Sequence, residues 1–131
     1  MRQMRAAAVG ILAGVALSLL LLSPAAARPV NRVLIAKAGY HDAYKISLTF
    51  VNGRKVKTIP AGTYTIVVHD YSKVHNFALG SVTANRRIFT GSIPGVGTRS
   101  YTLTLRRGTY AYACSAHPNV MNGTFVVVAT P

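Results

Sequence analysis

A cysteine, a histidine and a methionine lie within one short stretch near the C-terminus. Cys114 is the only cysteine of the chain, His117 follows three residues later, and Met121 comes four residues after that. A thiolate, an imidazole and a thioether are ligands that soft and borderline transition metals prefer, copper above all. The stretch offers one imidazole, whereas a trigonal copper site needs two. The sequence His75-Asn76-Phe77 is the obvious source of the second.

The candidate ligand loop lies between two segments that are expected to be strands. Residues 109–113 and 124–129 are apolar runs rich in β-branched and aromatic side chains. A pair of strands holds the loop between them at both ends. The sequence therefore predicts that Cys114, His117 and Met121 are positioned by a sheet.

Other short segments also have the composition of strands. Alternation or β-branched and aromatic side chains predict strands at residues 33–36, 44–51, 63–70, 74–79, 87–90 and 100–105, with His75 on the fourth of these. Asn52-Gly53 predicts a hairpin whose second strand is residues 54–59. After residue 27, no segment repeats apolar residues at the helical period. We therefore expect an all-β fold, a Greek-key β-sandwich of about seven to eight strands.

The first 27 residues have the features of a signal peptide. Arg2 and Arg5 precede an apolar run at residues 6–22, and small residues at 23–27 supply a cleavage site. We expect cleavage after Ala27, which leaves residues 28–131 as a single copper-binding domain; the alternative is an uncleaved anchor. The protein is then exported, whether periplasmic, at the cell surface or secreted. An unpaired cysteine is unusual in such a protein, and a metal-bound thiolate accounts for it.

The chain is strongly basic. It carries 15 lysines and arginines against Asp42 and Asp70, and without Arg2 and Arg5 the balance is 13 against two, close to +11. One interpretation is a solvated surface with scattered charges. The other is attraction to redox partner proteins with an acidic docking surface, or to an anionic envelope polymer or membrane. Export and the lack of a recognition motif argue against nucleic acid, and we expect a monomer.

The site motifs together resemble a known family. His-Asn-Phe, followed by Tyr-x-Cys-x-x-His-Pro-x-x-Met-x-Gly-x-Phe-x-Val, resembles the cupredoxins, the plastocyanin- and azurin-like small blue copper proteins, over roughly residues 44–129. Ala-Gly-Thr-Tyr at 61–64 and Asp-x-Ser-x-x-His-Asn-Phe at 70–77 are similar to short exported bacterial domains of that kind. The resemblance implies one mononuclear copper ion with His75, Cys114 and His117 as equatorial ligands and Met121 as the weak axial ligand. Asn76 is expected to support them through a hydrogen bond between the His75 segment and the Cys114 loop.

Several functions compete. The leading hypothesis is a type 1 copper protein that carries single electrons outside the cytoplasm, and the alternative is a copper-binding module for scavenging, storage or delivery. An enzyme is disfavoured, because the sequence has no His-x-His pair and no histidine next to Cys114, the motifs that would indicate a further copper site. Zinc suits the thiolate and imidazoles but gains little from a thioether. The alternative without a metal is that Cys114 is an inert buried thiol. His41 and His69 are interpreted as non-ligands.

Overall fold

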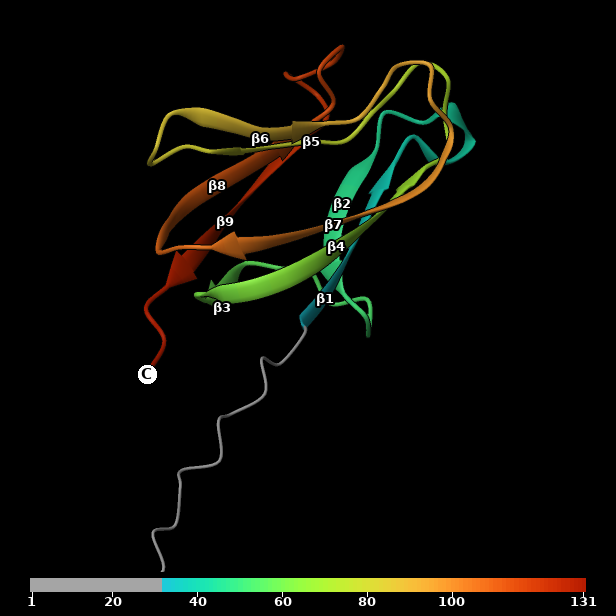
Figure 1. Ribbon diagram of the computed structural model, residues 1–131. Helices are drawn as coiled ribbons and strands as arrows, with labels where there is room; N and C mark the ends of the chain where they lie inside the picture. The colour runs from blue at the N-terminus through green and yellow to red at the C-terminus, as the bar shows by residue number, and fades with distance from the viewer. Residues whose placement is uncertain (1–31) are drawn as a thin grey trace, which may run out of the picture.

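The computed structural model describes residues 32–131, which form two β-sheets packed face to face (Figure 1). The first sheet has the order β2 (Ile46–Phe50), β1 (Arg32–Ala38), β4 (Gly62–Asp70) and β7 (Gly97–Leu105). The second has the order β3 (Thr58–Pro60), β9 (Asn122–Val128), β8 (Gly108–Ala113), β5 (Ala78–Ser81) and β6 (Arg86–Thr90). A short 3₁₀ turn, η1 (Tyr40–Asp42), connects β1 to β2. The predicted signal peptide, residues 1–27, lies outside the described residues.

The topology is that of a sandwich whose connections cross between sheets. The chain changes sheet after β2, β3, β4, β6 and β7, and β1 pairs in parallel with β4 while β3 pairs in parallel with β9. The all-β prediction is confirmed for residues 32–131, which form nine strands rather than the seven or eight expected. Among residues 32–131, no helix is long and apolar enough to span a membrane.

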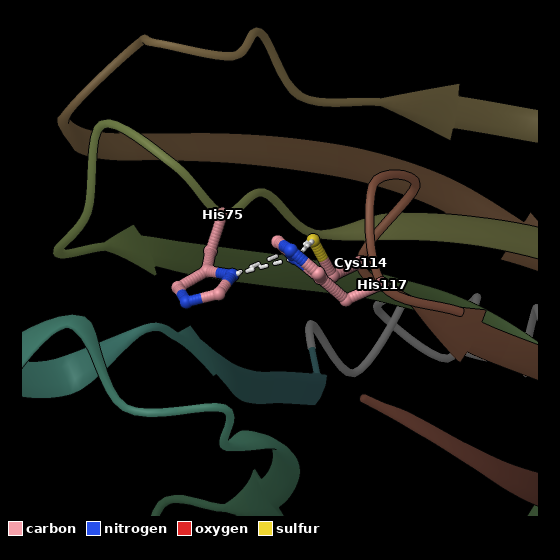
Figure 2. Close-up of side chains that lie close together, drawn as sticks. All are labelled: His75, Cys114 and His117. Carbon is pink, nitrogen blue, oxygen red and sulfur yellow. Dashed lines mark hydrogen bonds between the residues drawn. The ribbon is translucent and has the colours of Figure 1, made fainter. Parts of the chain in front are cut away.

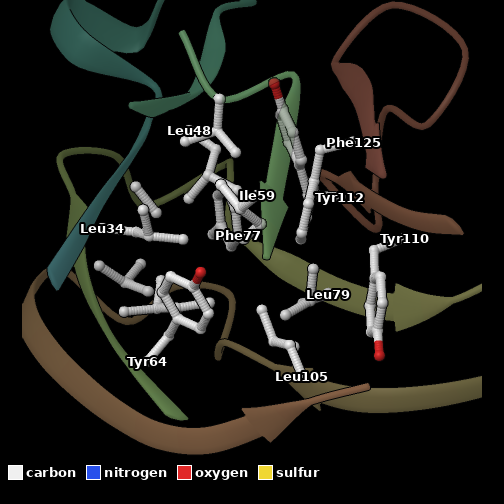
Figure 3. Packing of buried hydrophobic residues seen from close by; sticks show 14 of the residues in the cluster. Leu34, Leu48, Ile59, Tyr64, Phe77, Leu79, Leu105, Tyr110, Tyr112 and Phe125 are labelled. Atoms are coloured by element: carbon white, nitrogen blue, oxygen red, sulfur yellow. The ribbon is translucent and has the colours of Figure 1, made fainter. Parts of the chain in front are cut away.

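The core lies between the sheets and is closed by alternate residues of each strand. In β4, Tyr64 and Ile66 face inward, and β8 and β9 contribute Tyr112 and Phe125 from the opposite side (Figure 3). The rings of Phe77 and Tyr112 stack at 5.4 Å between centroids. Burial of one such large side chain stabilises the fold by about 1.5–3 kcal/mol. The core therefore supplies a rigid frame directly beneath the residues that precede Cys114.

The predicted hairpin at Asn52-Gly53 is only partly correct. The turn forms, with Gly53 at φ 83° and its N–H donating to the Phe50 carbonyl at 2.9 Å. The returning chain makes one isolated bridge, Thr49 to Lys55, and then joins the other sheet as β3. The reason is burial: Val56 and Ile59 are both buried in the core between the sheets, so the chain leaves the first sheet and pairs with the second.

The predicted strand at residues 74–79 is wrong for its first four residues, because β5 begins only at Ala78 and His75 lies in the preceding loop. Local side-chain hydrogen bonds explain the difference. Asp70 Oδ1 accepts the N–H of Ser72 at 3.1 Å, and Ser72 Oγ accepts the N–H of Val74 at 3.1 Å. Such bonds compete with the strand ladder for the same backbone donors. The His75 segment is consequently a turn fixed by its own side chains.

Candidate metal centre

Three of the predicted ligand atoms lie close together at one end of the sandwich. His75 Nδ1 and His117 Nδ1 are 3.1 Å apart, and Cys114 Sγ lies 3.8 Å from the first and 3.6 Å from the second (Figure 2). Within residues 32–131, this is the group of three histidine, cysteine or acidic side chains that meets the spacing of a metal site. Two imidazole nitrogens and one sulfur therefore converge on a single point.

The size of that triangle matches the coordination shell of a first-row metal ion. For sides of 3.1, 3.6 and 3.8 Å, the point equidistant from the three atoms lies about 2.0 Å from each. Metal–imidazole bonds are about 2.0–2.1 Å and metal–thiolate bonds about 2.3 Å. One ion fits in or near the plane of the triangle without movement of the side chains by more than a few tenths of an ångström.

A tight turn after β8 sets the spacing of Cys114, His117 and Met121. The N–H of Cys114 donates to the Met121 carbonyl at 3.0 Å, and the N–H of Met121 donates to the His117 carbonyl at 2.9 Å. The N–H of His117 in turn donates to the Cys114 carbonyl at 3.2 Å. The Met121 side chain is fully buried. These bonds gather all three residues into one compact loop that β8 and β9 hold at both ends.

A backbone carbonyl orients the His75 ring. His75 Nε2 lies 3.1 Å from the Asp42 carbonyl oxygen, and since a carbonyl only accepts, Nε2 carries the proton. The neutral ring then presents the lone pair of Nδ1 to Cys114 and His117. Asp42 is itself fixed, because its Oδ1 accepts the hydroxyl proton of Ser72 at 2.7 Å.

The η1 turn that carries this carbonyl has an unusual backbone. His41 and Asp42 both have φ of 54°, and Gly39 has φ of 66°. Left-handed conformations cost roughly 1–2 kcal/mol each for residues with a Cβ, and they cluster where a site requires them. The turn contacts the site through the Asp42 carbonyl and His75, and no pattern in the sequence predicts that contact.

Asn76 ties the two ligand-bearing segments together. The N–H of Ser115 donates to Asn76 Oδ1 at 2.8 Å, and Asn76 Nδ2 donates to Ser115 Oγ at 2.9 Å and to the Gly91 carbonyl at 2.8 Å. Asn76 is almost completely buried, so these are the bonds that satisfy its amide. The hydrogen bond expected from Asn76 to the Cys114 loop is therefore present, and Ser115 is its partner.

The inner side of the site is buried in the protein, and the Tyr44 ring covers its outer side. Cys114 is fully buried and His75 is 1% exposed, whereas His117 is half-buried. The ring of Tyr44 meets both imidazoles edge-on, with centroids 5.0 Å from His75 and 4.9 Å from His117, and is itself 61% exposed. Tyr44 is thus a side chain that touches both candidate histidine ligands and the solvent.

The other two histidines lie apart from this group. His69 Nδ1 is 2.9 Å from Thr98 Oγ1 on the neighbouring strand β7, and His41 is exposed in η1. Near the site, burial raises the pKa of the Asp70 carboxyl, while the N–H of Ser72 and the charges of His75 and Arg99 act in the opposite direction.

Comparison with known proteins identifies structural relatives but no close sequence relatives. Neither protein-family models nor curated protein sequences give a match. The fold is similar to that of the copper protein rusticyanin, with a TM-score of 0.55 and 19% identity over 73% of this chain and 76% of that one. It is also similar to auracyanin A, a "blue" copper protein from Chloroflexus aurantiacus, with a TM-score of 0.52 and 20% identity over 73% and 98% of the two chains.

Proposed function

The chain has the cupredoxin fold, and we propose that it is a mononuclear type 1 copper protein that carries single electrons outside the cytoplasm. His75, Cys114 and His117 are the proposed equatorial ligands, and Met121 is the proposed weak axial ligand. The observation that carries the proposal is the triangle of two Nδ1 atoms and one Sγ, whose centre lies about 2.0 Å from each atom.

The donor set favours copper over zinc. A structural zinc site takes four strong ligands in a tetrahedron, whereas this centre brings together three strong donors and a methionine on the same loop. Two imidazoles, a thiolate and a long thioether are the ligands of copper sites that transfer electrons. Copper supplies the ability to take up and release one electron between its two oxidation states.

The surrounding residues hold the ligands in place, which suits an electron carrier. The carbonyl of Asp42 fixes the His75 ring and Asn76 fixes the distance between the two ligand-bearing segments. Buried Cys114 excludes water from the sulfur. Because His75 is hydrogen-bonded to the Asp42 carbonyl and Cys114 and Met121 are buried, little rearrangement is expected between the two oxidation states. The half-buried His117 under Tyr44 gives an electron a short path to the surface.

The same features disfavour copper delivery. A protein that hands over its ion needs ligands that an acceptor can reach and replace, whereas Cys114 and His75 are almost entirely inaccessible.

The proposed extracytoplasmic location rests on the signal peptide expected at residues 1–27. It also rests on Cys114, because metal binding accounts for an unpaired cysteine in an exported protein. We also propose that the protein is not an enzyme; the solved structures with a similar fold are those of a copper protein and of a "blue" copper protein.

The experiment is a visible absorption and electron paramagnetic resonance titration of the purified protein with Cu(II). We expect one equivalent to give an intense thiolate-to-copper charge-transfer band, and Cys114→Ser to bind without that band. Reversible bleaching by one electron then separates a carrier from a storage protein. A protein that stays colourless with bound copper, or whose band survives in Cys114→Ser, contradicts the proposal.

A further inference from the structure

Charge is distributed very unevenly along the long axis of the described domain. Of the 15 lysines and arginines, Arg2, Arg5 and Arg28 precede residue 32, so 12 lie in the described part of the chain. Strand register identifies the two ends: Ala38 of β1 pairs with Asp70 of β4 near the metal centre, and Arg32 pairs with Tyr64 at the other end. We call the latter the basic end. It carries Arg32, Arg54, Lys55, Lys57, Arg86, Arg87, Arg106 and Arg107.

Both acidic residues of the chain lie at the metal end. Asp42 contacts His75, and Asp70 is the last residue of β4, where Lys37, Lys45, Lys73 and Arg99 are the basic residues nearby. The metal end therefore has four positive and two negative charges, and the basic end has eight positive charges and no carboxylate side chain. Such a separation orients the molecule in the field of an anionic partner.

The basic end contains a cleft of about 870 Å³ with cationic walls and an apolar floor. Its walls carry Arg32, Arg54, Lys55 and Lys57, while Phe50 and Ile59 belong to its floor. Arg32 is held in place, because its Nη1 donates to Tyr64 Oη at 3.0 Å and its guanidinium lies over the same ring at 5.6 Å. The cleft thus combines one hydrogen-bonded cation, Arg32, with three exposed ones, which suits an anion attached to an apolar body.

The cationic surface continues beyond this cleft. Gly62 lies close to Arg32, because a Cβ atom built on this glycine would be 3.5 Å from Arg32 Nη1. Gly62 also pairs with Leu105, the residue before Arg106. Arg106 lines a second cavity of about 420 Å³ with Arg86 and Arg107. Seven of the eight charges therefore line two cavities at the same end of the sandwich, one beside β2 and β3 and the other beside β6 and β7.

An apolar residue projects from the rim of the cleft. Val51 is 72% exposed in the turn between β2 and β3, where it follows the partly buried Phe50 and precedes Arg54 and Lys55. The described chain also begins at this end, since Arg32 is its first residue and stands at the lower end of β1 (Figure 1).

We propose that the basic end docks on an anionic phospholipid surface, with lipid phosphates in the cleft of Arg32, Arg54, Lys55 and Lys57 and with Val51 in the headgroup region. Basic residues near an anionic leaflet and an exposed apolar side chain among them are the two contributions from which peripheral membrane binding is built. An acidic protein could also take up the charges, and the Val51→Ser comparison below distinguishes it from lipid. The metal centre then faces away from the lipid, where a redox partner reaches it. This docking goes beyond the proposed electron-carrier function and does not depend on the ion.

The test is co-sedimentation with vesicles of phosphatidylcholine, with and without phosphatidylglycerol, at about 0.1 M salt. Residues 28–131 are used because every buried residue of the described core lies within them. We expect binding only to the anionic vesicles, and Lys55→Gln/Lys57→Gln is expected to weaken it by about tenfold or more. The matched control is Lys37→Gln/Lys45→Gln, which removes the same charge from exposed positions at the metal end and should retain binding within about threefold.

Val51→Ser separates lipid from soluble polyanions. Loss of the apolar contact is expected to weaken vesicle binding several-fold and to leave binding to polyglutamate unchanged. No binding to anionic vesicles, equal losses in the two lysine double variants, or a Val51→Ser variant that binds vesicles as tightly as the unaltered domain would each overturn the proposal. The last result would assign the basic end to an acidic polymer or protein.

Discussion

Asn76 and Ser115 are joined by three hydrogen bonds: Ser115 N–H to Asn76 Oδ1 at 2.8 Å, Asn76 Nδ2 to Ser115 Oγ at 2.9 Å, and Ser115 Oγ to Asn76 Oδ1 at 3.2 Å. Each residue directly follows a candidate ligand, Asn76 after His75 and Ser115 after Cys114. The pair therefore sets the distance between the two segments from which the imidazole and the thiolate project. Its removal should disturb both the fold and the metal affinity.

Asn76→Ala leaves the Ser115 N–H and the Gly91 carbonyl without their buried partner. We expect the free energy of unfolding of the metal-free protein to fall by about 1–3 kcal/mol and copper affinity to fall about 10–100-fold. Denaturant unfolding and competition with a chelator measure the two. Asn122→Ala is the control, because it removes one exposed bond to the Pro118 carbonyl in the same loop. Equal effects of the two substitutions would contradict the assignment.

Gly39→Ala tests the turn that orients His75. A Cβ at this position would lie 2.6 Å from Ser72 Cβ and 2.9 Å from His75 Cδ2, and the residue already has φ of 66°. We expect a loss of about 2–4 kcal/mol in stability together with weaker copper binding. Gly53→Ala provides the comparison, since Gly53 has φ of 83° but no atom within 4 Å of the added Cβ. It should lose about 1–2 kcal/mol and bind copper unchanged, and reduced copper binding in both variants would refute a specific role for Gly39.

Met121 is the proposed axial ligand, and its replacement should change the reduction potential more than the binding. Met121→Leu keeps the volume of the fully buried side chain and removes a weak donor, which favours Cu(I) and raises the potential. Met121→Gln supplies a harder donor, which favours Cu(II) and lowers it. Voltammetry of the three proteins should therefore rank Leu above Met above Gln. Identical potentials would remove Met121 from the coordination shell.

Tyr44 covers the histidine ligands from the solvent side. Tyr44→Ala is expected to expose the His117 edge, so an external chelator should extract copper several-fold faster. Tyr40→Ala serves as the control: Tyr40 is similarly exposed at 58%, and its ring contacts are to His41 and Tyr71 rather than to His75 or His117. Stopped-flow absorbance measures both rates, and equal rates would show that Tyr44 does not limit access.

Asp70 should make the metal-free protein less stable as the pH rises. Burial raises the pKa of this carboxyl in the folded state, so the folded protein binds the proton more tightly than the unfolded chain does. The stabilisation is present at low pH and is lost as the pH rises through the raised pKa. In Asp70→Asn the amide oxygen still accepts the Ser72 N–H without titrating. The Tm of Asp70→Asn relative to the unaltered protein should increase between about pH 3 and about pH 7; a decrease would contradict the direction of the shift.

Strand positions could be predicted wherever alternation and β-branched residues coincide, as in β4 and β7, because the half-buried face of a strand is written into its own segment. β3 and the loop at His75 could not. Val56 and Ile59 are buried in a core formed by residues far away in the sequence, so the second strand of the hairpin does not form. The Ser72 hydroxyl accepts the Val74 N–H, a donor that a strand would use for pairing.

The candidate ligands were predictable because chemistry restricts them to a few residue types, and the chain has one cysteine. The residues that orient them were not. The Asp42 carbonyl is a backbone group without a side-chain signature, and Tyr44 meets His75 and His117 only once β1 and β2 have turned the chain back across the sandwich end. Such contacts depend on tertiary structure and leave no local pattern.

The Asn76–Ser115 pair also determines whether protein folding or metal binding offsets the entropy cost of bringing the ligands together. His75 and Cys114 are 39 residues apart, and an ion that joined them in a loose chain would have to close that loop at the expense of its own binding energy. Here the amide and the strand pairs β5–β8 and β8–β9 close it during folding. The binding free energy of the ion then goes into affinity rather than into ordering the chain, and loss of the ion should leave the shape of the domain intact.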